Sequence, residues 1–105
     1  MDIDHVWEKL YLAVLGMARS TQPLQERLAN AYVSALHQLE DEDLPEDLID
    51  DFEKVIEALT RVGEPVLEGE GSVHATVREM DDETARQLIE EIVDLYDSIA
   101  KRVGL

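Results

Sequence analysis

Apolar residues recur at steps of three and four along most of the chain. The clearest case is residues 82–103, where the apolar residues on one side are Ala85, Leu88, Ile89, Ile92, Leu95, Tyr96, Ile99 and Val103. These steps match the 3.6-residue turn of an α-helix, whereas a half-buried strand alternates every two residues. The pattern therefore predicts an all-α fold.

The same periodicity divides the chain into separate helices. It predicts four principal helices and one short helix, over residues 3–19, 23–39, 45–62, 72–79 and 82–103. Short connections between the principal helices favour an antiparallel helical bundle. Residues 63–71 hold three glycines and a proline, which predicts a flexible loop. Because 105 residues is the size of one ordinary domain, we expect a single helical-bundle domain over 1–105.

The first two predicted helices carry more apolar surface than one core contact requires. Each has an apolar arc of roughly 200°, wider than a single core-facing stripe. Either these helices lie centrally among the others, or a second copy of the chain covers the surplus, as obligate dimer interfaces resemble cores cut in half. We expect a homodimer through these two helices. The expected partner-binding residues are Trp7, Tyr11, Leu12, Leu15, Ala29, Val33 and Leu36.

The formal charge of −16 is distributed unevenly. Residues 1–39 contain four acids and three bases, whereas residues 40–105 contain 21 acids and six bases, a net charge of −15. Such a negative field repels nucleic-acid phosphates and anionic lipid headgroups, so we expect no direct contact with nucleic acid or a membrane surface. A basic protein partner is compatible with it.

Acidic residues also form a face on the last predicted helix. Glu83, Glu90, Asp94 and Asp97 lie opposite its apolar side, and residues 40–53 add nine acids without a base. Together they would imitate a row of phosphates, which suggests an alternative function: an acidic antagonist or antidote that neutralises a basic nucleic-acid-binding or toxic protein. An ordinary solvated surface explains the same charges.

Residue patterns that support catalysis or metal binding are weak. The chain has no cysteine, no phosphate-binding glycine loop and no nucleophile motif, so we expect no enzyme activity and no cofactor. His5 with Glu8 and His37 with Glu40 have spacings that suggest a carboxylate–histidine metal-binding bundle as a further alternative. Neither histidine falls on the main apolar arc of its helix, which argues against ligation inside the core.

The sequence also gives an expectation about location. The first four residues, Met-Asp-Ile-Asp, are acidic where a secretory signal would be basic. The most apolar run, residues 10–17, is far shorter than the roughly 20 residues that span a bilayer. We therefore expect a cytoplasmic protein, and most simply a non-enzymatic protein–protein interaction module.

Overall fold

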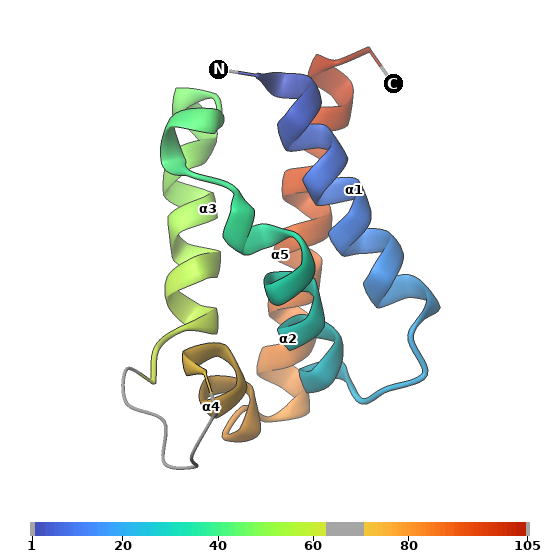
Figure 1. Cartoon of the computed structure of the whole chain (residues 1–105), viewed down its shortest axis with the longest axis vertical. Helices are drawn as coiled ribbons and strands as arrows, with labels where there is room; N and C mark the ends of the chain where they lie inside the picture. The colour runs from blue at the N-terminus through green and yellow to red at the C-terminus, as the bar shows by residue number, and fades with distance from the viewer. Residues whose placement is uncertain (1, 63–70, 105) are drawn as a thin grey trace.

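The computed structural model describes residues 2–62 and 71–104. Within them the chain forms five α-helices: α1 (Ile3–Arg19), α2 (Leu24–Ser34), α3 (Glu46–Leu59), α4 (Ser72–Arg78) and α5 (Asp82–Arg102) (Figure 1). Two 3₁₀ turns, η1 (Leu36–Gln38) and η2 (Asp41–Asp43), join α2 to α3. The described ranges contain no strand, which confirms the all-α prediction. Apart from Gly71, the loop predicted at 63–71 lies outside the described residues.

The first and last helices begin and end close to where the sequence predicts. Asp2 caps α1 by accepting the backbone N–H of His5 at 3.2 Å, and Asp81 caps α5 by accepting that of Thr84 at 2.8 Å. These side chains satisfy donors that a helix start leaves without an intrahelical partner. The first turn of α1 and the last turn of α5 lie at the same end of the molecule (Figure 1). None of the helices in the described ranges is long and apolar enough to cross a bilayer.

The second helix is shorter than predicted, and the expectation of one helix over 23–39 is wrong. It ends at Ser34 because Ala35, with φ −142° and ψ −60°, leaves the helical region, and the chain continues as η1. This turn places Leu36 and Leu39 in the core, 1% and 5% exposed. The apolar periodicity runs on through Ala35, so it gives no sign of the break.

The core lies around α2, which contacts α1, α3, α4 and α5. A single cluster of buried residues takes members from every one of these helices, among them Leu10, Leu28, Phe52, Val77 and Ile92. The wide apolar arc of the second predicted helix is therefore covered within the chain. Of the two explanations for its surplus, a central position is the one that the structure supports for α2.

Two buried or half-buried polar side chains join segments that are distant in sequence. Thr76 is fully buried, and its Oγ1 accepts the backbone N–H of Val62 at 3.0 Å, which holds α4 against the end of α3. Gln25 donates from Nε2 to the carbonyl of Met80 at 3.0 Å and to Oδ1 of Asp82 at 2.8 Å. The start of α2 is thereby fixed to the junction between α4 and α5.

Candidate interaction surface

The side of α1 that faces away from the core is the main exposed apolar feature on the described part of the chain. Figure 1 shows α1 on the outside of the molecule, in front of α5, which it contacts. Its buried residues Val6, Leu10, Ala13 and Met17 share one side. On the opposite side, Tyr11 is 40% and Leu12 is 41% exposed. We call the arc of roughly 100° that includes them the α1 outer face; its residues are Asp4, Glu8, Tyr11, Leu12, Leu15 and Arg19.

Three aromatic rings connect this face to α5. Trp7 and Tyr11 are stacked, with ring centroids 5.2 Å apart and planes at 15°, and Tyr11 lies 6.4 Å from Tyr96 at 41°. Separations of this size are those of favourable aromatic pairs. Trp7 is half-buried against the core cluster, and its Nε1 has no hydrogen-bond partner among the described residues. The indole therefore belongs to the packing between α1 and α5, and Tyr11 is the most exposed of the three aromatic residues.

The seven predicted partner-binding residues do not form one surface. Tyr11, Leu12 and Val33 are exposed, Trp7 and Leu15 are half-buried, and Ala29 and Leu36 are 0% and 1% exposed. Ala29 and Leu36 are therefore core residues that a partner cannot reach in this fold. Helix α2 keeps Val33 as its one exposed large hydrophobic residue in the described structure, at 48%. Exposed apolar surface is accordingly concentrated on α1.

An apolar groove of about 280 Å³, which the sequence did not predict, borders α1. Its lining residues come from α1, α2 and α5: Val14, Met17, Ala18, Leu24, Arg27, Arg86, Ile89, Glu90 and Val93. Val93 is 40% exposed because it lies at the margin of the apolar side of α5. The groove extends the apolar surface from α1 onto α5, and three charged residues line it.

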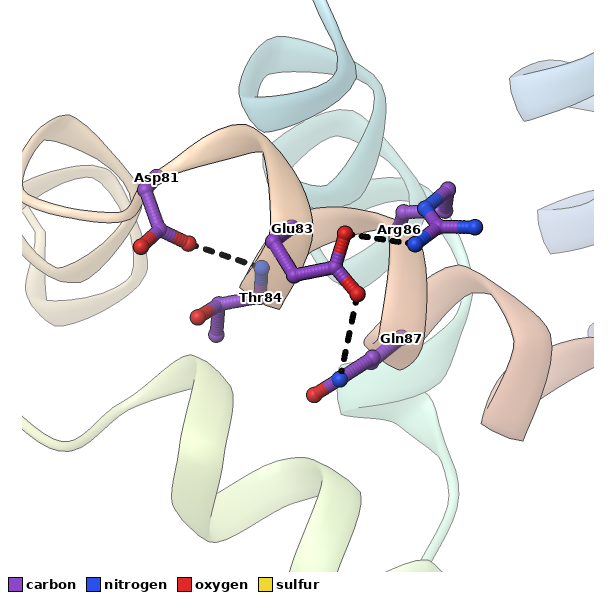
Figure 2. Close-up of polar contacts among 5 residues, drawn as sticks. All are labelled: Asp81, Glu83, Thr84, Arg86 and Gln87. Carbon is purple, nitrogen blue, oxygen red and sulfur yellow. Dashed lines mark hydrogen bonds and ion pairs between the residues drawn. The ribbon is translucent and has the colours of Figure 1, made fainter.

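The four acids predicted as one face of α5 are all exposed, but they do not form a uniform negative row. Figure 2 shows Glu83 paired with Arg86 and accepting a hydrogen bond from Gln87 at 3.4 Å. Asp97 pairs with Lys101 at 2.8 Å. Two of the four carboxylates are thus partly neutralised by neighbouring bases. Asp94 lines a different groove, between α3 and α5, and Glu90 lines the apolar one.

Negative charge is densest at η2 and along α3. Hydrogen bonding to Asp41, followed by repulsion from the same carboxylate, raises the pKa of Glu53 above its ordinary value. Burial and the charges of Asp50 and Glu57 raise it further. At the start of α3 the opposite holds, because hydrogen bonds from Arg102 lower the pKa of Asp47. In the acidic segment, Asp47 is therefore paired with a base, whereas Glu53 lies among other carboxylates.

The histidines predicted as possible metal ligands lie apart from any ligand cluster. Over residues 2–62 and 71–104, no three His, Asp or Glu side chains are grouped so that they could hold a metal ion. His37 is exposed, and its Nδ1 lies 3.1 Å from the carbonyl oxygen of Tyr32, so one ring nitrogen is engaged with the backbone.

The geometry thus offers two surfaces for binding: an apolar helix face on α1 and an acidic region at η2 and α3. The first is nearly neutral, since α1 carries two acids and two bases, and the second contains nine acids over residues 40–53. No protein-family model, curated protein or solved structure matches the chain.

Proposed function

We propose that this protein is a non-enzymatic protein–protein interaction module, an antiparallel helical bundle that pairs with a second copy of itself through the α1 outer face. The observation that carries the proposal is the position of Tyr11 and Leu12. They lie next to each other at the middle of α1, 40% and 41% exposed, on a helix whose other side is fully committed to the core. Large residues at the centre of an interface supply most of its binding energy.

Charge supports a second copy as the partner. Each molecule carries a net charge of −16, so two copies repel each other unless the nearly neutral parts meet. Helix α1 has a formal charge of zero, whereas η2 and α3 would bring crowded carboxylates together. Pairing through α1 leaves the acidic segment 40–53 free to lie outward, in water.

The proposed interface differs from the one expected from the sequence in its use of α2. Ala29 and Leu36 are buried. Of the partner-binding residues predicted in the segment 23–39, only Val33 is therefore exposed. We therefore assign the contact to α1, with the neighbouring surface of α5 at its border. The Tyr11–Tyr96 contact makes the two helices one continuous surface.

The test is the oligomeric state of a matched pair of variants. Sedimentation equilibrium of the wild type is expected to show a dimer, and Leu12→Glu is expected to shift it towards monomer because each interface would bury two extra charges. Val33→Glu likewise replaces an exposed apolar side chain with a carboxylate, at the most exposed large hydrophobic residue of the described ranges, and is expected to leave the dimer intact.

Each other outcome contradicts a defined part of the proposal. A wild type that stays monomeric up to about 100 μM would exclude functional self-association of ordinary micromolar affinity. Equal dissociation by Leu12→Glu and Val33→Glu would move the interface back onto α2. Circular dichroism of both variants confirms that they keep the helical fold.

A second candidate function, an acidic antagonist of a basic protein, is favoured by the raised pKa of Glu53. Hydrogen bonding to Asp41 and then repulsion from the same carboxylate raise this pKa, and a cationic partner would relieve the repulsion. Capture from the native lysate at low salt should then retain a basic protein that is lost when salt screens the field. Retention that does not depend on salt would contradict this candidate.

A further inference from the structure

The residues of the α1 outer face are arranged symmetrically along the helix. Positions 4 and 19, 8 and 15, and 11 and 12 lie at equal distances on either side of the midpoint between Tyr11 and Leu12. Charge is reversed across that midpoint, because Asp4 and Glu8 lie towards the start and Arg19 at the end. Such a face is complementary to a copy of itself when the two helices run in opposite directions.

We infer that two copies pair α1 against α1 in antiparallel orientation, about a two-fold axis between Tyr11 and Leu12. This inference rests on the proposed self-association and names its geometry. Each Tyr11 then lies beside Tyr11 of the other copy and each Leu12 beside Leu12 of the other copy, at the two edges of the contact, and each Asp4 lies level with Arg19 of the other copy. Because a two-fold interface is isologous, the Asp4–Arg19 contact occurs twice.

The dimensions of the helix agree with this pairing. Asp4 and Arg19 are about 22 Å apart along the axis, so the face spans most of the helix. Packed helices that cross at roughly 20° stay close over this length, which lets the long arginine side chain reach the opposite aspartate. A parallel pairing would instead place Asp4 against Asp4 and Arg19 against Arg19. Like charges in those positions oppose the parallel arrangement.

The three charged residues of the face are available for such contacts. Asp4, Glu8 and Arg19 are all exposed. The cap of α1 is supplied by Asp2, which accepts the backbone N–H of His5, so Asp4 is not needed as the N-cap. Glu8 lies opposite Leu15 of the other copy and within a helical turn of its Arg19, which adds a second acid near the same base.

Charge reversal tests the antiparallel pairing directly. In Asp4→Arg and in Arg19→Asp, the two attractive pairs of the dimer become two repulsive pairs, and each variant is expected to dimerise about tenfold more weakly. An equimolar mixture of the two variants restores opposite charges at both places, because one copy carries two arginines and the other two aspartates. Sedimentation of the mixture is expected to show a heterodimer close to wild-type affinity.

Two further variants complete the experiment. The double variant D4R/R19D should recover self-association, since its reversed charges are again complementary. Glu26→Arg is the control, because it makes the same change of charge as Asp4→Arg in the first turn of another helix, α2. The two changes should destabilise a helix start equally, but Glu26→Arg is expected to leave the dimer unchanged.

The results separate this inference from the proposed function. A dimeric wild type whose single variants associate no better when mixed would exclude the antiparallel pairing while self-association stands. A monomeric wild type would exclude both. Weakening by Glu26→Arg equal to that by Asp4→Arg would show a general charge effect and overturn the assignment of Asp4.

Discussion

Arg102 donates two parallel hydrogen bonds to the carboxylate of Asp47, from Nη1 to Oδ1 at 2.8 Å and from Nη2 to Oδ2 at 2.5 Å. The pair joins the last turn of α5 to the first turn of α3, across 55 positions of sequence. Two-point contacts of this kind fix orientation better than a single ion pair. The pair connects the last turn of α5 to the acidic segment 40–53.

Asp47→Asn is expected to lower the melting temperature at neutral pH. The hydrogen bonds from Arg102 lower the pKa of Asp47 in the folded protein. A lowered folded pKa gives stability that is present above the unfolded pKa and is lost as the pH falls through the folded value. The difference in melting temperature between wild type and variant should therefore disappear in acid.

Asp50→Asn on the same helix is the control for this change. Its carboxylate adds to the repulsion that raises the pKa of Glu53, so its removal should not destabilise the fold. An equal loss of melting temperature in the two variants would mean that the Arg102 contact contributes nothing specific.

Glu53→Gln is expected to raise the melting temperature at neutral pH. The pKa of Glu53 is raised in the folded protein, mainly by hydrogen bonding to Asp41 and by its charge. A raised folded pKa gives stability that is complete below the unfolded pKa and is lost as the pH rises through the folded value. The variant avoids that loss, so its advantage should vanish in acid. A variant less stable than wild type at neutral pH would show that the hydrogen bond between Glu53 and Asp41, which requires a shared proton, stabilises the fold more than the repulsion destabilises it.

Thr76→Val is expected to cost about 1–3 kcal/mol in the free energy of unfolding, because the Val62 N–H loses its side-chain partner and the Ser72 carbonyl loses the hydrogen bond from the hydroxyl. Thr76→Ser keeps the hydroxyl and removes one buried methyl group, at a cost of about 1 kcal/mol. Urea denaturation of both variants separates the hydrogen bonds from the packing. A valine variant as stable as the serine variant would mean that these hydrogen bonds contribute little.

Trp7→Phe is expected to change the free energy of unfolding by less than about 1 kcal/mol, since it keeps a stacked ring beside Tyr11 and removes a donor that has no partner in the described structure. Trp7→Ala removes the ring itself and should cost about 3 kcal/mol. Thermal or urea unfolding measures both. Equal losses would show that the indole N–H makes a contact of its own.

The extent of the first and last helices could be predicted because local signals mark them. The sequence predicts a helix over 3–19, and α1 is Ile3–Arg19, capped by Asp2. It also predicts a helix over 82–103, and α5 begins at Asp82 and ends at Arg102. In each case the apolar period ends close to where the cap residues stand. Local residue patterns were therefore sufficient to predict the bounds of these two helices.

The end of α2 and the composition of the surface could not be predicted in the same way. The backbone leaves the helical conformation at Ala35, but the three- and four-residue spacing of apolar residues continues past it. No local signal therefore marks the end of α2. The width of an apolar arc shows how much surface must be covered, and it does not show which element covers it. Ala29 and Leu36 are buried by other parts of the chain, and the Asp47–Arg102 pair depends on helices that only the fold brings together.

The ties between distant segments have a consequence for synthesis on the ribosome. Gln25 and Met80, which are hydrogen-bonded, are separated by 55 positions in the sequence, as are Asp47 and Arg102. The central helix α2 therefore emerges long before the residues that fix it, and α5, with Ile92 and Ile99 fully buried, emerges after α1 to α4. The nascent chain cannot complete this core until α5 has been synthesised. A ribosome stalled before residue 82 would hold a chain that exposes the apolar side of α1 and α2 to chaperones.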